Sequence, residues 1–296
     1  MEALQARIAD QLAATIHPEV AAFGQALADK AGASAVLFYG SNLRTGSLEG
    51  MLDFYVLLPG PQQERIWPRV SYHERGASTG EILRAKVATM SLERFAEAAE
   101  GSRMDTTIWA RFVQPSGLVW ARDDAGKRAV ISAIGSAAQT AAHLAAALGP
   151  DEGAAQDYWR ALFRATYRAE FRVEKAGRED SILSINAVHF DGLFPIALEA
   201  AGIAFDMQDG VIAPKFEKGE RARILGWWKR RRRMGKPLNV VRLVKASATF
   251  DGAARYAAWK IERHTGVPVQ VTDFRERHPL LAAPAVMLDV WRKRGK

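Results

Sequence analysis

Cysteine is absent from the 296 residues of this chain. Disulfide bonds, thiolate metal ligands and cysteine nucleophiles are therefore excluded, and the composition fits a protein of the reducing cytoplasm without a disulfide partner. The chain also lacks the Gly-x-x-x-x-Gly-Lys sequence of a P-loop and the Gly-x-Gly-x-x-Gly sequence of a dinucleotide site. Its six histidines form no HExxH pair, so the sequence does not favour a zinc enzyme.

A long uninterrupted apolar segment is missing from the N-terminus. Residues 1–31 mix apolar side chains with acids and predict an amphipathic helix rather than a signal peptide. Residues 129–148 come nearest to a membrane span. Gln139, His143 and the many alanines of this segment instead indicate a buried or amphipathic helix of a soluble protein.

Positive charge is concentrated in one segment of the chain. The formal net charge is +8, and residues 215–236 contain ten Lys or Arg and two Glu, which is also +8. The remainder of the chain is therefore neutral on balance. A local surplus of this size predicts a polyanionic partner such as an anionic membrane, nucleic acid or phosphate groups.

Two tryptophans come directly before the most basic part of that segment. Tryptophan settles at the headgroup level of a bilayer and Lys and Arg attract anionic lipid, so an anionic membrane surface is the expected partner. Nucleic acid is the weaker alternative, because the same residues can stack bases and bind phosphates. A solvated face of a basic helix would also use this pattern. The residues concerned are Trp227, Trp228, Lys229, Arg230, Arg231, Arg232 and Arg233.

The pattern of apolar residues changes along the chain. Short apolar runs predict strands at 35–40, 51–58, 81–90 and 117–121, with a loop rich in Pro, Gly and Ser at 59–80. The charged segment 122–128 reads as a boundary, and helical periodicity follows it. We therefore expect an α/β domain with a mixed sheet at 1–128 and a predominantly helical domain at 129–296.

One motif joins the first two predicted strands. Gly40-Ser41 follows the first strand, and after eleven further residues Asp53 stands at the start of the second. Glycine lets backbone N–H groups approach phosphate oxygens closely, and a strand carboxylate can hold Mg²⁺ against phosphates. This spacing resembles the signature of the nucleotidyltransferase fold, although Tyr55 occupies the place of the usual second acid. A turn cap is the alternative role for Asp53.

Lys86 lies in the middle of the apolar strand predicted at 81–90. A buried lysine without a partner is costly, so we expect Lys86 to meet a phosphate or an acid. Lys260 and Arg263 belong to a further basic set on the C-terminal helices, within a segment (259–264) expected to contribute to a pocket.

Several stretches taken together resemble the mitochondrial-type phosphatidate cytidylyltransferases. YGSNLRTG and MLDFYVLL are similar to that family's first motif, in which an apolar residue also follows the aspartate at the second acid position. Ala85-Lys86-Val87, ARFVQPSGLVW (110–120) and TYRAEFRVE (166–174) then resemble further family segments in the same order. The likeness covers roughly residues 36–180 and points to a bacterial branch.

The resemblance implies a nucleotidyltransferase-like domain that transfers CMP from CTP to phosphatidate, with Mg²⁺ as cofactor, on the inner face of the membrane. It implies catalytic roles for Asp53, Lys86 and Glu170, of which Asp53 and Glu170 would hold the metal. It also implies nucleotide binding by Gly40, Ser41, Tyr55, Arg111 and Arg172. Two alternatives stay open: transfer to a soluble molecule or nucleic acid, and non-catalytic binding of nucleotide or RNA by a degenerate site.

Overall fold

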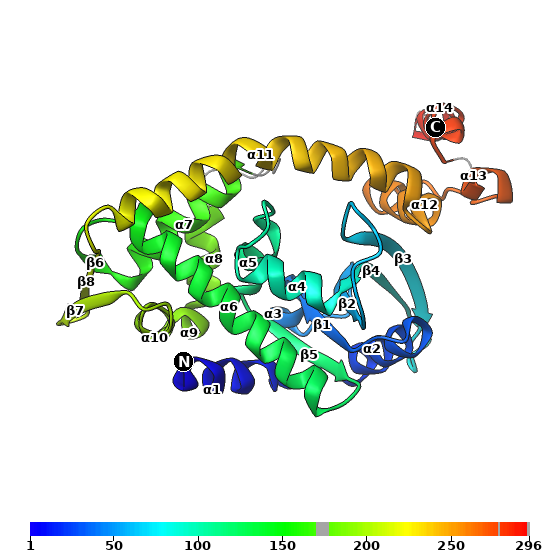
Figure 1. Cartoon of the computed structure of the whole chain (residues 1–296). Helices are drawn as coiled ribbons and strands as arrows, with labels where there is room; N and C mark the ends of the chain where they lie inside the picture. Colours follow the sequence, from blue (N-terminus) through cyan, green and yellow to red (C-terminus); the bar gives the residue numbers. More distant parts are fainter. Residues whose placement is uncertain (170–177, 278, 295–296) are drawn as a thin grey trace.

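The computed structural model describes residues 1–169, 178–277 and 279–294 (Figure 1). Its N-terminal half contains a five-stranded sheet in the order β3-β4-β2-β1-β5. Strands β2 and β4 are parallel, and the other neighbours are antiparallel, so the sheet is mixed. The strands are β1 (Ala35–Tyr39), β2 (Leu52–Leu58), β3 (Arg69–Gly76), β4 (Ile82–Ser91) and β5 (Ser116–Ala121).

Helices make up most of the remaining structure. They are α1 (Glu2–Leu12), α2 (Pro18–Ala31), α3 (Ser41–Thr45), α4 (Leu92–Ala99), α5 (Thr107–Phe112), α6 (Asp124–Leu148), α7 (Ala155–Ala169), α8 (Arg178–Ile185), α9 (Ala187–Phe190), α10 (Leu193–Ala200), α11 (Glu220–Thr249), α12 (Ala253–Thr265), α13 (Asp273–Arg277) and α14 (Pro279–Arg294). A small second sheet has the order β6-β8-β7, with β6 (Gly153–Ala154), β7 (Ala204–Gln208) and β8 (Val211–Lys215).

Each face of the five-stranded sheet is covered by a different set of helices. Alternate side chains of a strand lie on opposite faces. Phe54 and Val56 of β2 therefore pack with Phe23 of α2 on one face. Leu57 and Tyr55, from the same strand, join the other face, where α4, α5 and α6 supply the packing. Burial of both faces accounts for the nearly continuous apolar run of this strand.

The larger core extends across the boundary that we expected at residue 128. That boundary lies inside α6, which begins at Asp124 after the Asp123 carboxylate caps the Gly126 N–H. Leu37 of the sheet and Phe194 of α10 belong to one continuous cluster of buried residues. Helix α6 therefore packs against elements on both sides of the expected boundary.

Helix α6 is also the one described helix long and apolar enough to cross a membrane by length and composition. Most of the apolar window that meets this test is buried inside the protein, chiefly through its alanines. It therefore packs as a core helix, as we expected from Gln139 and His143.

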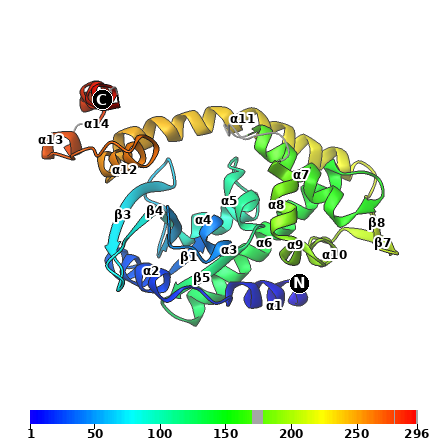
Figure 2. The same cartoon turned by 180° about the vertical axis from the view of Figure 1, so that it is seen from behind.

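The chain returns to the sheet near its C-terminus. Helix α11 runs from the small sheet to the five-stranded sheet, and α12 then packs beside β3 (Figures 1 and 2). The Tyr72 N–H of β3 donates a hydrogen bond to the Asp251 carbonyl, 2.8 Å away. Arg242 and Lys245 of α11 also form ion pairs, with Asp105 and Glu64 respectively. The C-terminal part thus closes over the edge of the N-terminal sheet.

The predicted α/β region followed by a helical region is confirmed at this level. The four predicted strands correspond to β1, β2, β4 and β5 within one or two residues at each end. The prediction of a loop at 59–80 is wrong, because Arg69–Gly76 forms the edge strand β3. Only Tyr72 of this strand is buried, so its sequence carries no apolar run.

Candidate functional site

The register of the sheet brings three polar side chains together. Two of them were predicted as site residues, and the third lies next to the Gly40-Ser41 turn in the sequence. Asp53 of β2 is paired with Lys86 of β4 and with Tyr39 of β1. Residues paired across neighbouring strands project from the same face of a sheet. The carboxylate, the ammonium group and the phenol therefore lie side by side at one end of these strands.

The Gly40-Ser41 turn stands directly against this carboxylate. Gly40 has a φ of 95° and precedes the short helix α3. A Cβ at this position would lie 3.1 Å from Oδ2 of Asp53. Glycine is therefore required here both for the backbone conformation and for the close approach to the acid. The pairing of a Gly-Ser turn with a strand aspartate in the sequence corresponds to a direct contact in the fold.

A cavity of about 410 Å³ opens over these residues. It brings together five of the predicted residues: Gly40, Ser41, Asp53, Lys86 and Arg111. Arg111 comes from α5, and the far wall is formed by α7 and α8. The remaining lining residues are Tyr39, Arg44, Gln114, Pro115, Tyr167, Ser181, Ile182, Ile185 and Asn186.

Asp53 is the single acid among the described residues that line this cavity. Burial raises the pKa of its carboxyl group above the usual value, and the nearby charges of Lys86 and Arg111 partly oppose that rise. Within the described parts of the chain, the carboxylate accepts no hydrogen bond. The cavity is also lined by Arg44, so cations outnumber acids among the described residues that line it. Such a site favours a ligand that carries several negative charges.

Tyr55 does not have the nucleotide-binding role that the sequence analysis assigned to it. Its side chain is only 1% exposed and packs on Phe112 and Phe95 in the core. Its hydroxyl oxygen accepts a hydrogen bond from Nη1 of Arg111 at 3.2 Å. The Arg111 guanidinium also lies over the ring of Tyr39, 5.2 Å from its centre. Tyr55 therefore orients an arginine that lines the cavity, and its ring fills the core.

The expected second metal ligand, Glu170, and the expected nucleotide-binding Arg172 lie outside the described residues. In the described ranges, no group of three or more His, Asp or Glu side chains could enclose a metal ion. Mg²⁺ binds to proteins through as few as one or two carboxylates, with substrate phosphates and water completing its shell. A half-buried carboxylate that accepts no hydrogen bond from described residues suits that mode, so Asp53 fits Mg²⁺ held together with a phosphorylated ligand.

A scan against protein-family models and a search of curated proteins both found no match. Function must therefore be judged from the cavity and its residues.

The basic segment 215–236 has two faces with different roles. Trp228 and Arg231 were expected to bind a membrane or another polyanion, but they are 4% and 5% exposed and face the protein interior. The Arg231 side chain donates hydrogen bonds to the carbonyls of Gly101 and Arg103, and it lies 3.9 Å from the centre of the Trp227 ring. Trp227 itself is half-buried. The exposed members of the predicted set are Lys229, Arg230, Arg232 and Arg233.

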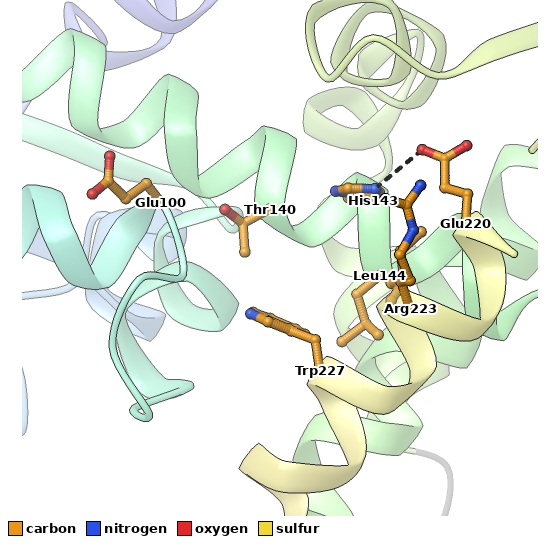
Figure 3. A pocket seen from close by; sticks show the side chains of 8 residues that line it. Glu100, Thr140, His143, Leu144, Glu220, Arg223 and Trp227 are labelled. Carbon is orange, nitrogen blue, oxygen red and sulfur yellow. Dashed lines mark ion pairs between the residues drawn. The ribbon is translucent and has the colours of Figure 1, made fainter. Parts of the chain in front are cut away.

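A second cavity, of about 330 Å³, lies between α6 and α11. Figure 3 shows His143 of α6 pointing toward Glu220 of α11, with 4.0 Å between Nε2 and the carboxylate. Burial lowers the pKa of His143, so the ring is neutral at pH 7 and the contact is not an ion pair there. Trp227 forms another wall and is the one predicted site residue that lines this cavity. None of the catalytic or nucleotide-binding residues predicted from the sequence is among the described residues that line this second cavity.

Sequence reasoning missed several residues of the main cavity. Arg44 and Tyr39 flank the Gly40-Ser41 turn, so their nearness to the motif could have identified them. Asn42, buried beneath the turn, donates hydrogen bonds to the carbonyls of Ser47 and Glu49 and fixes the loop that leads to Asp53. Asn186 of the far wall had no signal, because only the tertiary fold brings its segment to the cavity.

Proposed function

We propose that this chain is a Mg²⁺-dependent nucleotidyltransferase that transfers CMP from CTP to phosphatidate or a similar lipid phosphate. The observation that carries the proposal is the gathering of Gly40, Ser41, Asp53, Lys86 and Arg111 around one cavity of about 410 Å³. These residues come from four separate segments, and all of them were selected for the chemistry of phosphoryl transfer. A nucleotidyltransferase-like fold for the mixed sheet is part of this proposal.

The charges of the cavity suit a triphosphate and an anionic acceptor. Lys86, Arg111 and Arg44 would bind phosphate oxygens, and the Gly40-Ser41 turn would allow close approach of the chain to them. Asp53 would hold Mg²⁺, which neutralises phosphate charge and favours in-line displacement. An acceptor phosphate oxygen would attack the α-phosphorus of CTP. The bond to the bridging oxygen would break, and pyrophosphate would leave.

A phosphate acceptor also agrees with the presence of one acid, Asp53, and no histidine among the described residues that line the cavity. A phosphate monoester is already ionised at pH 7, so its attack requires little help from a general base. The cations would stabilise the charge that develops as the bonds change, an effect that is strong where water is excluded.

Apolar surface at the C-terminus supports a lipid acceptor over a soluble one. On α14, Trp291 is 74% exposed and Met287 is 62% exposed. An adjoining groove of about 430 Å³ between α12 and α14 has an almost wholly apolar lining, with Ile261 and Val290 among its residues. With the exposed cations of α11, this surface fits an anionic bilayer, and we place the protein at the inner face of the membrane.

Non-catalytic binding of nucleotide is the second candidate. It is favoured by one observation, namely that Asp53 is the single described acid in the cavity. Many nucleotidyltransferases use two or more carboxylates, and loss of one would leave a site that binds without transfer.

Transfer can be measured directly with the purified protein, Mg²⁺, each of the four labelled nucleoside triphosphates and phosphatidate micelles, followed by lipid extraction. We expect label from CTP in the lipid fraction. Asp53→Asn should reduce the rate by about 10-fold or more, as loss of a metal-binding group does. Asp10→Asn, which changes an exposed aspartate of α1, should leave the rate unchanged.

Two results would contradict the proposal. CTP that binds to the wild type without any transfer to lipid would favour the non-catalytic candidate. Transfer that survives in Asp53→Asn at more than about a tenth of the wild-type rate would place the chemistry on another acid.

A further inference from the structure

Next to the main cavity, two arginines share one tryptophan. Arg84 lies on β4 two residues before Lys86, so both side chains project from the same face of the sheet. Trp259 comes from α12, which packs beside β3. The guanidinium groups of Arg84 and Arg263 lie 5.8 Å and 5.3 Å from the centre of the Trp259 ring. Segments nearly 180 residues apart thus bring two like charges onto one side chain.

Arg263 also contacts the loop that leads to Asp53. Gly50 has a φ of 88°, and a Cβ on it would lie 3.1 Å from Nη1 of Arg263. The register pairs Leu52 with Ala85, so the chain entering β2 runs past Arg84. The Arg84–Trp259–Arg263 cluster therefore borders the loop that leads to the Asp53 carboxylate.

Among the described residues, the two arginines of the cluster have one acid, Glu74, as an ion-pair partner, and it pairs with Arg84. Among the described residues, Arg263 forms no ion pair and is exposed. Arg84 forms an ion pair with Glu74 across 3.6 Å and its Nη1 donates a hydrogen bond to the Ile82 carbonyl at 3.1 Å, while its Nε is shielded from solvent without a hydrogen-bond partner. The Glu74 carboxylate already accepts a hydrogen bond from the hydroxyl of Tyr72. Two arginines held together in this way are arranged to bind a doubly charged oxyanion.

We propose that Arg84 and Arg263, aligned by Trp259, form a second phosphate-binding subsite beside Asp53. The subsite takes a phosphate group, which belongs either to the acceptor or to the triphosphate tail of the nucleotide. It rests on the proposed function for the identity of these substrates. The tryptophan acts as a positioning residue, because its ring holds the two guanidinium groups, and the ligand binds the N–H groups of Arg263 and those of Arg84 that do not bond Ile82.

Binding of phosphates can be tested apart from transfer. We would measure the affinity of the full chain for tripolyphosphate and for glycerol 3-phosphate by titration calorimetry without Mg²⁺. The first probe stands for the tail of the nucleotide and the second for the headgroup of the acceptor. Arg263→Gln and Arg84→Gln should each weaken one of the two probes by about 10-fold or more, as loss of a charged hydrogen bond does.

The choice of variants controls for folding and for net charge. Arg263 is exposed, so Arg263→Gln should fold normally, and Arg263→Lys should recover only part of the affinity because lysine lacks the planar fork. Arg128→Gln removes the same charge from an exposed position on α6 and should bind both probes as the wild type does. The probe that loses affinity identifies the source of the phosphate.

The subsite would be refuted if Arg263→Gln and Arg84→Gln bound both probes within about 2-fold of Arg128→Gln, because only bulk charge would then be acting. Loss of transfer in Asp53→Asn together with that result would leave the proposed function intact. If Arg263→Gln and Arg84→Gln lose affinity for one probe while the wild type shows no transfer to lipid, the phosphate-binding subsite is supported and the proposed transferase activity is refuted.

Discussion

The carboxylate of Asp53 lies in a buried position that disfavours its charged form. Burial raises its pKa above the ordinary value of 3.8, and the attraction of Lys86 and Arg111 does not cancel that rise. A buried carboxylate with a raised pKa in a cavity is a candidate for a functional role, which is the role that we propose for Asp53. It follows that function and stability conflict at this position.

Asp53→Asn should therefore leave the folded state at least as stable as the wild type at pH 7. A raised pKa means that the folded wild type loses stability as pH rises from the unfolded pKa through the folded pKa. The advantage of the amide should consequently disappear as the pH is lowered to about 3.5, near the ordinary pKa of aspartate. Urea unfolding of both proteins at several pH values measures this, and a variant much less stable than the wild type at pH 7 would contradict it.

The predicted site residues that the fold brings together around one cavity share a particular kind of signal. Gly40 and Asp53 stood out because a glycine turn and an acid at the mouth of an apolar strand have few structural uses together. Lys86 stood out because a charge interrupts an apolar strand. Tyr55 was predicted to line the site because alternation along β2 places its side chain on the same face of the sheet as Asp53. That alternation could not show that helices cover the face at position 55 and bury the ring. Arg84 and Arg263 could not be paired, since only the tertiary fold brings them together.

At the scale of elements, the consecutive basic residues of α11 occupy two different environments, the protein interior and the solvent-exposed surface. Its basic residues are consecutive, so a helix must point some of them inward. Arg231 points inward, where burial lowers its pKa to about 10 and backbone carbonyls hold its guanidinium. Arg230 points outward. Neighbouring arginines in the sequence are therefore expected to differ in function.

Arg231→Gln should lower the free energy of unfolding by about 1 to 3 kcal/mol, because buried carbonyls lose their donor. Arg230→Gln should change that free energy by no more than about 0.5 kcal/mol.

The triple variant of Arg230, Arg232 and Arg233 should bind anionic vesicles more weakly, since each charge near a surface contributes about 1 kcal/mol. Chemical denaturation and vesicle sedimentation give the two readouts. RNA binding lost in the triple variant, without vesicle binding in the wild type, would contradict the membrane assignment.

Strands were predictable where the sheet is buried and unpredictable where it is exposed. Strands β1, β2, β4 and β5 pack helices on their faces, which gives them apolar sequences. The edge strand β3 has polar residues on both faces, so nothing in its sequence distinguishes it from a loop. Helical periodicity predicted a predominantly helical region at 129–296, but it did not reveal the small strands β7 and β8 within that region.

At the scale of the whole molecule, one continuous cluster of buried residues spans the boundary that we expected at residue 128. The charged segment 122–128 suggested a boundary, yet most of it forms the first turn of α6. Sequence could not show this, because the start of an exposed helix and an interdomain linker have similar compositions. Only the contacts of α6 with both halves distinguish them.

Unfolding of the whole chain should accordingly be a single cooperative transition. Far-UV circular dichroism reports the helices throughout the chain, and tryptophan fluorescence reports Trp109 and Trp159 in the shared core. The two signals should give coincident midpoints in urea. Separated midpoints would show that residues 1–128 and the helical part unfold independently.

The hydrogen bond from Tyr72 to Asp251 can form only late in the synthesis of the chain, after Asp251 has left the ribosome. The edge of β3 is complete at residue 76, but the segment that covers it leaves the ribosome about 175 residues later. At about 5 to 20 residues per second, the nascent chain would expose an unpaired strand edge for roughly 10 to 35 s. An exposed edge is a template for aggregation, and the polar side chains of β3 protect the chain during that interval.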